Sequence, residues 1–351
     1  MSLDDIVAGT REAAGLFDMA HRGLLEVRGE DRVRWLDGMI SGDVRALESS
    51  GLGAGCYATF LTNRGAIVAD LHVARFKEAY LLESLRSEVP RIREALERYV
   101  IADDVTLVDR SDEFVTLGLE GPQAPALLAK ATCGETRDLE RDCWVDTTIA
   151  GRNVLVAAFG FSGESAYQLR IKPSDRLAVE EVLVDTANED RLVRGNLEAL
   201  EVLRVEAGIP MLGAELDDEV LPPEARLERA ISTSKGCYVG QEIVARLRAR
   251  GQVNHLLVGF RIESSPIPAV GTKLSAGGRV TGELTSIVVS PTEGPIALGY
   301  VRREHAEAGT PIEFDGGRAR VASLPFIAGG TLGAAVEGAL PSTDSDDLGV
   351  T

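Results

Sequence analysis

The chain has 351 residues, of which 55 are acidic and 37 are basic, and its formal net charge at pH 7 is -18. With 44% hydrophobic and 26% charged residues it has the composition of a globular protein, and its length predicts two or three domains. The charge argues against direct binding to nucleic acid or to an anionic membrane. A small anionic ligand is still compatible with it, because a binding site needs only a few local cations.

The N-terminal sequence gives no indication of export. It is acidic, and it lacks the basic region and apolar run of a signal peptide; no stretch of the chain approaches the roughly 18 apolar residues of a membrane span. The four cysteines, Cys56, Cys133, Cys143 and Cys237, do not make a disulfide framework in a chain of this length. We therefore expect a reduced, cytoplasmic protein.

The first 250 residues mix strand pairs with helices. Alternating apolar residues predict strands at 24–28, 79–84, 104–109 and 113–120 and hairpins at 56–76 and 153–172. Helical spacing predicts helices after 29–31, at 87–100, 123–130, 174–187 and 196–207, and a short one after residue 242. This mixture favours an α+β fold over a strictly alternating parallel-sheet protein.

The pattern changes after Gly251. Short strands are predicted at 255–262, 279–290, 295–301, 311–314 and 318–323, separated by turn sequences and by no helix other than a short one at 303–307. Such spacing is typical of a small antiparallel barrel or sandwich. We therefore predict an α+β part at 1–250, with subdomain splits near 50 and 120, a β-barrel at 251–327, and a poorly ordered tail of small and acidic residues at 328–351.

Common catalytic motifs are missing from the sequence. The glycine-rich run at 51–55 leads into a predicted strand, so it is interpreted as a turn and not as a phosphate loop. The four histidines are scattered and no Cys-x-x-Cys occurs, so no metal site is expected. No GxSxG sequence indicates a serine hydrolase.

The segment KGCYVGQE at 235–242 is the most informative part of the chain. It places Cys237 beside Lys235 and just before a predicted helix, and both an ammonium group and a helix N-terminus stabilise a thiolate. The neighbouring Gly236 and Gly240 permit close backbone approach. A reactive thiol and a tight structural loop with a buried cysteine are both compatible with this pattern.

This segment closely resembles the signature of the YgfZ family, folate-binding proteins linked to iron–sulfur cluster maintenance and related to the glycine-cleavage T-protein. Other segments match in the same order, so that the resemblance spans about residues 20–325: 28–38, 62–65, 69–71, 119–122, 160–164 and 203–210. The resemblance implies an N-terminal α+β part that binds tetrahydrofolate and a C-terminal antiparallel β-barrel around a central cavity.

The resemblance also suggests site residues. It implies Cys237, Lys235 and Asp70 as catalytic residues, and as folate contacts Asn63, Asp70, Gln168, Arg204, Glu206, Tyr238, Gln241 and Glu242. Arginine suits the carboxylates of the folate tail, although Arg204 could instead pair with Glu201 or Glu206 on its own helix. Because the protein is so acidic, a cluster of cations around Arg204, Lys235 or 246–250 is expected to attract that tail.

Two positions depart from the T-protein pattern. Such sequences carry paired acids after the first hairpin turn, one of them catalytic, whereas this chain has Ala69 and Asp70. The T-protein acid that holds the pterin falls near Gln168, which can form hydrogen bonds but brings no charge. Both changes weaken the case for aminomethyl transfer and remain compatible with folate binding.

The preferred hypothesis is therefore a tetrahydrofolate-binding accessory protein for iron–sulfur cluster assembly or repair. Its partners would be iron–sulfur proteins or their assembly factors, and any link to tRNA modification would run through such an enzyme. One alternative is an aminomethyltransferase that moves a one-carbon unit from a lipoyl-carrier protein to tetrahydrofolate. The other is a folate sensor or scaffold without catalysis, so whether the protein is an enzyme is left open.

Overall fold

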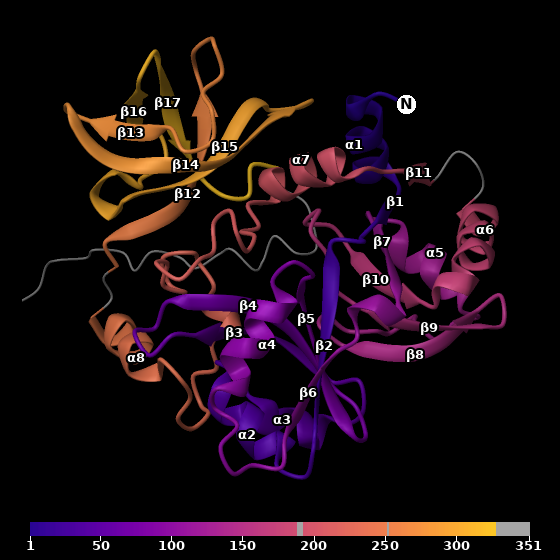
Figure 1. The fold of residues 1–351 in the computed structure, drawn as a ribbon. Coiled ribbons are helices and arrows are strands. Elements are labelled where there is room, and N and C mark those ends of the chain that lie inside the picture. The colour runs from indigo at the N-terminus through magenta and orange to yellow at the C-terminus, as the bar shows by residue number, and fades with distance from the viewer. Residues whose placement is uncertain (188–191, 251–252, 328–351) are drawn as a thin grey trace, which may run out of the picture.

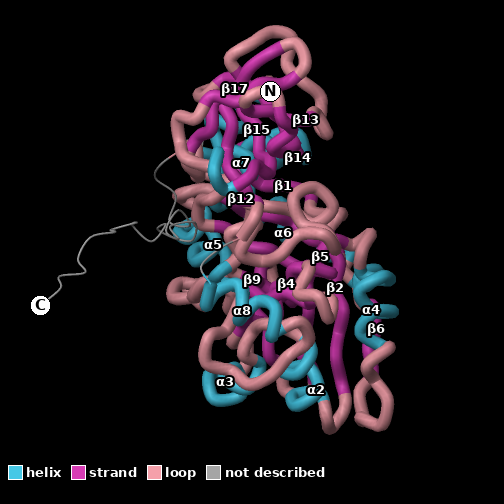
Figure 2. The backbone as a smooth tube through the Cα atoms, turned by 90° about the vertical axis from the view of Figure 1, so that its left-hand side faces the viewer, coloured by secondary structure: helices cyan, strands magenta, loops and turns pink. Residues whose placement is uncertain are grey.

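Two mainly antiparallel sheets and a closed barrel form the protein (Figure 1). The computed structural model describes residues 1–187, 192–250 and 253–327. The predicted α+β fold with a C-terminal antiparallel barrel is confirmed. The barrel lies at one end of the molecule and the two sheets lie below it (Figure 2). Within the described residues, no helix is both long and apolar enough to cross a bilayer.

The first sheet has the strand order β3-β4-β5-β2-β6 and is antiparallel throughout. Its strands are β2 (Arg22–Arg28), β3 (Gly55–Leu61), β4 (Ile67–Arg75), β5 (Ala79–Leu85) and β6 (Thr106–Asp109). The helices beside it are α2 (Arg32–Met39), α3 (Val44–Ser50) and α4 (Val89–Glu97). Every residue of β4 except Arg75 is buried, because one face of the sheet packs on these helices and the other faces the second sheet.

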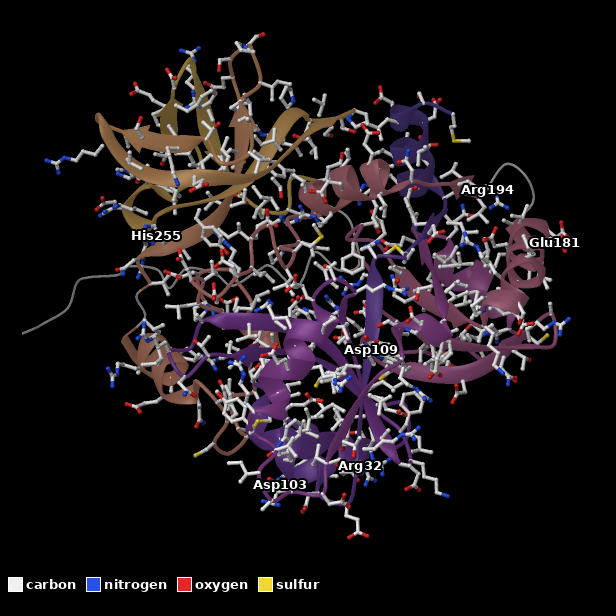
Figure 3. The ribbon with its side chains drawn as sticks, viewed as in Figure 1. Arg32, Asp103, Asp109, Glu181, Arg194 and His255 are labelled. Atoms are coloured by element: carbon white, nitrogen blue, oxygen red, sulfur yellow. The ribbon has the colours of Figure 1, made fainter. Side chains whose placement is uncertain are left out.

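The second sheet has the order β11-β1-β7-β10-β9-β8, with β1 and β11 as its parallel pair. Its strands are β1 (Gly15–Asp18), β7 (Val115–Glu120), β8 (Trp144–Ile149), β9 (Arg152–Ala157), β10 (Ala166–Ile171) and β11 (Val193–Arg194). Helices α5 (Ala124–Ala131) and α6 (Arg176–Ala187) share one apolar core with it. Figure 3 shows the charged side chains Glu181 of α6 and Arg194 of β11 on the outside of this part of the molecule.

The barrel closes in the order β12-β15-β14-β13-β16-β17. Its strands are β12 (His255–Ile262), β13 (Lys273–Ala276), β14 (Arg279–Ser290), β15 (Gly294–Arg302), β16 (Pro311–Phe314) and β17 (Gly317–Ala322). Helix α7 (Leu197–Ala207) joins the barrel to the rest, because Val205 packs with Leu257 and Phe326 in one cluster. The expected helix at 303–307 is a short 3-10 turn, Arg303–His305.

Several elements were not predicted from the sequence. They are α1 (Leu3–Glu12), β1, α3, β8, β11 and β13. Strand β13 has one fully buried residue, Leu274, so it carries almost no alternating signal. The domain boundaries at 250 and 327 and the subdomain splits stay predictions, and the tail at 328–351 lies outside the described residues.

Helix α8 (Gln241–Arg250) returns to the first sheet. Val244 on this helix is buried, and Gly65 in the β3–β4 turn lies close enough that an added Cβ would meet Ile243 at 3.0 Å. Gly240 has a φ of +82° just before the helix, and a Cβ there would come within 2.6 Å of the Thr62 carbonyl oxygen. The KGCYVGQE segment is therefore fixed against the turn by glycines at both contact points.

We expect acid to destabilise the fold through His21, between β1 and β2. Its Nδ1 is buried without a partner among the described residues, and burial together with the charge of Arg22 lowers its pKa to about 4. Between pH 6.5 and pH 4 the imidazole of His21 is therefore protonated in the unfolded chain and neutral in the folded chain. The free energy of unfolding decreases as the pH is lowered through that window. After discounting for partial exposure, the effect is roughly 1–2 kcal/mol.

Urea unfolding at pH 7 and pH 4.5 measures this loss. His21→Asn should lose less stability over the interval than the natural protein, and His305→Asn, at a surface position, should lose the same amount. An equal loss in all three proteins would remove His21 from the explanation.

Candidate functional site

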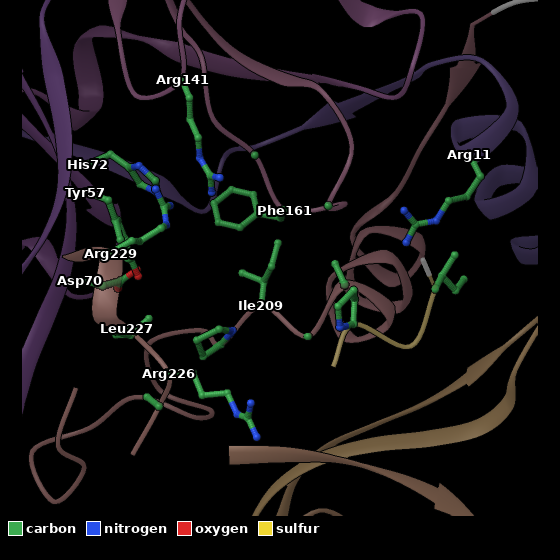
Figure 4. A pocket seen from close by; sticks show the side chains of 18 residues that line it. Arg11, Tyr57, Asp70, His72, Arg141, Phe161, Ile209, Arg226, Leu227 and Arg229 are labelled. Carbon is green, nitrogen blue, oxygen red and sulfur yellow. The ribbon is translucent and has the colours of Figure 1, made fainter. Parts of the chain in front are cut away.

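A cavity lies where the first sheet, the β9–β10 loop, the segment after α7 and the chain after β17 meet (Figure 4). The first sheet contributes Tyr57, Asp70 and His72, and the loop contributes Phe161. Residues 207–210 and 225–227 form another wall, and Pro325 and Ile327 come from beyond the barrel. The cavity is lined by four arginines, Arg11, Arg141, Arg226 and Arg229. Its lining is therefore cationic and aromatic although the whole chain is strongly acidic.

Asp70 and Tyr57 form the centre of the first wall. They lie on the neighbouring strands β4 and β3, and the Tyr57 hydroxyl donates a hydrogen bond of 3.0 Å to Oδ2 of Asp70. Burial raises the pKa of Tyr57 well above its usual value, and the adjacent charge of Asp70 adds to the effect. Tyr57 therefore stays protonated and acts as a fixed hydrogen-bond donor to the carboxylate.

His72 is held on the same wall by Asp142. Its Nδ1 lies 3.2 Å from Oδ1 of Asp142, and its ring stacks on Phe159 with a centroid distance of 3.6 Å. Arg229 forms a 2.8 Å ion pair with Oδ2 of Asp142 and places its guanidinium over the ring of Tyr57. Burial alone would raise the pKa of Asp142, but its hydrogen bond to His72 and the arginine charges hold it well below its usual range.

The β9–β10 loop is positioned by two charged side chains. Glu120 on β7 is fully buried and accepts hydrogen bonds from the backbone amides of Phe161 and Ser162. Arg11 on α1 donates to the carbonyl oxygen of Ser162 and pairs with Glu164 and Glu206. These contacts fix the ring of Phe161 at the cavity wall, although its loop has no regular secondary structure.

A buried ion cluster lies between the two sheets. Glu83 is fully buried, accepts two hydrogen bonds from Arg22 and lies 3.6 Å from Arg170. Burial raises the pKa of Glu83, but the charge and hydrogen bonds of Arg22 outweigh this and lower it overall. Both terminal nitrogens of Arg170 and Oε1 of Gln168 are buried without a hydrogen-bond partner among the described residues. This region therefore has unused hydrogen-bonding capacity.

Of the site residues predicted from the sequence, all of which lie in the described ranges, Asp70 alone lines the cavity. Gln168 is fully buried on β10, and its amide donates to the carbonyl oxygen of Phe159, whose ring contacts His72. Asn63 is exposed at the β3–β4 turn. Glu206 is buried and accepts from Arg11 and from the hydroxyl of Ser290. The structure therefore does not bring the predicted folate contacts together.

Arg204 is 2% exposed and its guanidinium is fully used. It pairs with Glu201 and Glu215 and donates to the carbonyl oxygen of Ile209 and to Ser286. The ion pair with Glu201, which we weighed as an alternative to a folate contact, is thus present. Glu206, the other residue weighed as an ion-pair partner of Arg204, pairs with Arg11 instead.

The KGCYVGQE segment forms a separate surface. Cys237 is exposed, and it shares a shallow hollow with Arg34, Asp37 and Arg45. The ammonium of Lys235 points inward, where it donates to the carbonyl oxygens of Asp37, Ile40 and Gly42 and pairs with Asp37. Lys235 therefore fixes the end of α2. Of the two alternatives left open for Cys237, the one with a buried cysteine is wrong.

The remaining residues of that segment make local contacts. Tyr238 is buried, and its ring lies 5.3 Å from the ammonium of Lys235. Gln241 donates to the carbonyl oxygen of Gly236, and Glu242 pairs with Arg246 one turn along α8. These residues stabilise the loop and do not reach the cavity.

Sequence reasoning missed Tyr57, His72, Arg141, Asp142 and Arg229. One signal was available for the first two, because polar side chains at alternate positions of an otherwise apolar hairpin indicate a polar sheet face. Asp142 lies in an irregular segment and Arg229 in a short 3-10 turn 87 residues further along the chain, and no local pattern predicts their contact. Among the described residues, no group of three or more His, Cys, Asp or Glu side chains is arranged to hold a metal ion.

Two family models cover most of the chain. The GCVT N-terminal domain matches residues 4–235, and the glycine cleavage T-protein C-terminal barrel domain matches residues 256–327. The chain belongs to the glycine cleavage T-protein family. The fold supports this placement, because a crystal structure of the glycine cleavage system aminomethyltransferase T from Bartonella henselae has a TM-score of 0.82, with 93% of this chain and 90% of that chain covered at 24% identity.

Other T-protein relatives are similar along nearly their whole length. An aminomethyltransferase from Saccharopolyspora erythraea is 33% identical over 324 residues, which is 90% of this chain and 87% of that protein. One from Streptomyces coelicolor is 32% identical over 305 residues, 86% of this chain and 81% of that protein. The T-protein side of the sequence resemblance is thus confirmed. These relatives bear the name of the first alternative, aminomethyltransferase, and not that of the YgfZ family.

Proposed function

We propose that this protein transfers a one-carbon unit from an aminomethyl donor to tetrahydrofolate bound in the cavity. The observation that carries the proposal is the Asp70 carboxylate, held by Tyr57 on a wall lined by cations and aromatic rings. The similarity to aminomethyltransferases supports the same reaction class. The proposal reverses our sequence-based preference, because Asp70 lies in the cavity whereas Cys237 lies outside it.

The chemistry of the lining fits a reduced folate. Phe161 offers an aromatic face for its flat ring, and Arg141 and Arg226 offer guanidinium groups for its carboxylates. When bound, tetrahydrofolate would supply the two amines that receive the carbon.

Each residue of the wall has a simple task in such a transfer. Asp70 accepts a proton released from an amine, and a carboxylate hydrogen-bonded by Tyr57 is held in one orientation for it. Arg229 lies over the ring of Tyr57 and keeps it in place. Phe161 and Ile209 limit access of water from the opposite side.

A direct assay tests the proposal. The purified protein is mixed with aminomethylated lipoyl-carrier protein and tetrahydrofolate, and formation of methylene-tetrahydrofolate is followed by absorbance. Calorimetric titration with tetrahydrofolate runs in parallel. Binding with product formation supports the proposal. Binding without product indicates a folate sensor or accessory protein, and absence of binding overturns the placement of folate in the cavity.

A second candidate function rests on Cys237. This thiol is exposed beside Arg34 and Arg45, within the segment that resembles the YgfZ signature. An accessory role in iron–sulfur cluster assembly or repair, and through it in tRNA modification, would use this surface. Full complementation of iron–sulfur enzyme activity by Cys237→Ala, in a strain that lacks the gene, would remove the thiol from that role.

A further inference from the structure

His72 lines the cavity and is held by several contacts, but the proposed reaction has so far given it no role. It follows Asp70 by two residues on β4, so both side chains lie on the same face of the strand. Both line the cavity, and Figure 4 shows them next to each other with Tyr57 and Arg229. The imidazole of His72 is therefore the next side chain on this face of β4 after the carboxylate of Asp70, to which we assign proton transfer.

The contacts of His72 select one tautomer. Its Nδ1 faces the carboxylate of Asp142, and because an ionised carboxylate only accepts hydrogen bonds, Nδ1 must carry the hydrogen. Stacking on Phe159 at an interplanar angle of 6° prevents the ring from turning. No hydrogen bond to Nε2 is present among the described residues. Nε2 is therefore left as an acceptor in a residue that lines the cavity.

Asp142 is held in place at a conformational cost. Its φ is +61°, a left-handed conformation that costs most residues free energy and that aspartate tolerates better than most of them. Gly55 approaches so closely that an added Cβ would lie 1.9 Å from the carbonyl oxygen of Asp142. The backbone amide of Asp142 donates to the carbonyl oxygen of Ala158, and its carboxylate also pairs with Arg229. The close approach of Gly55, the backbone hydrogen bond to Ala158 and the ion pair with Arg229 together determine the position of the Asp142 carboxylate.

The geometry points to His72, oriented by Asp142, as a second proton acceptor of the cavity, a role that rests on the proposed transfer reaction. Placing one CH2 group between two amines breaks one N–H bond on each nitrogen. Asp70 takes one proton and Nε2 of His72 takes the other. The two protons then pass to the leaving groups: R–S–CH2–NH3⁺ plus two N–H groups gives R–SH, NH4⁺ and N–CH2–N, with no oxidant or reductant needed.

Asp142 stabilises the cation that His72 becomes when it takes a proton. A carboxylate on Nδ1 holds the ring and balances its positive charge, as in other histidine–carboxylate pairs. The other charged or titratable groups around His72 come from four further segments. They are Tyr57 on β3, Glu83 opposite on β5, Arg229 in the 3-10 turn Glu228–Ala230, and Arg141 in the segment before β8.

His72→Gln tests the role, because glutamine can form hydrogen bonds but cannot take the proton. We expect kcat for aminomethyl transfer to fall about 10²–10³-fold, while KM for tetrahydrofolate changes less than threefold. Asp142→Asn should lower kcat by less than His72→Gln does, because the ring remains and loses only its partner on Nδ1, again with KM for tetrahydrofolate within threefold. His255→Gln, on the exposed side of the barrel, is the matched control.

A second measurement does not depend on turnover. In ¹⁵N-histidine NMR, the natural protein should show His72 with its hydrogen on Nδ1, and the tetrahydrofolate-bound protein should show a shift at Nε2. If the natural protein has no transfer activity, the proposed function fails and this spectrum still decides about His72. A hydrogen on Nε2, no response to folate, or an unchanged kcat in an active His72→Gln protein would each overturn the inference.

Discussion

Asp70→Asn is expected to lower the kcat of aminomethyl transfer by about 10²–10⁴-fold, the range typical of losing a positioned general base. The amide is nearly the same size as the carboxylate, and its oxygen still accepts the hydrogen bond from Tyr57. Tetrahydrofolate affinity should therefore change little. Steady-state kinetics and calorimetric titration of the same preparation separate the two effects.

The matched control for this variant is Asp315→Asn, which makes the same chemical change at an exposed turn of the barrel. It should keep the natural kcat. If Asp70→Asn loses folate binding in proportion to turnover, Asp70 is a ligand contact and not a proton acceptor. If neither quantity changes, the cavity wall that it occupies is not the site of the reaction.

Glu83→Gln is expected to cost about 3–5 kcal/mol of unfolding free energy, the usual loss when one partner of a buried ion pair is removed. Glu83 is fully buried, and its carboxylate balances Arg22, which is 6% exposed, and Arg170, which is 2% exposed. Without it, two buried guanidinium groups between the sheets lose the carboxylate that is hydrogen-bonded to one of them and lies nearest to the other. Urea unfolding at pH 7 measures the change directly.

Glu78→Gln supplies the comparison, since Glu78 is exposed at the turn just before β5. Its unfolding free energy should stay within about 0.5 kcal/mol of the natural value, as for most surface substitutions. A loss of less than about 1 kcal/mol in Glu83→Gln would mean that water replaces the carboxylate and that the space between the sheets is not dry.

The fold was largely predictable because its elements have strong periodic patterns. The hairpin at 56–76 and the strands of the barrel alternate in polarity, and helix α7 has apolar residues at helical spacing. Strand β8 and helix α1 were missed for different reasons. β8 follows an irregular acidic segment, whereas α1 is short and carries charge in its first turn.

The site was much less predictable, because its side chains come from segments that meet only in three dimensions. Asp70 was found through a motif, whereas Arg229 and Asp142 lie in loops whose contact is set by tertiary packing. Arg204 was misleading for a physical reason. A buried arginine has to find counter-charges, and Glu201 and Glu215 supply them before any ligand can.

The lining of the cavity extends from Arg11, near the start of the chain, to Ile327, beyond the last strand of the barrel. During synthesis, the ribosome must therefore release almost every described residue before the last wall is in place. A ligand that binds only the finished cavity stabilises the correctly joined sheets and barrel as one unit, by mass action. Ligand supply would then act as a check on the quality of newly made protein, because misassembled chains would gain nothing from it.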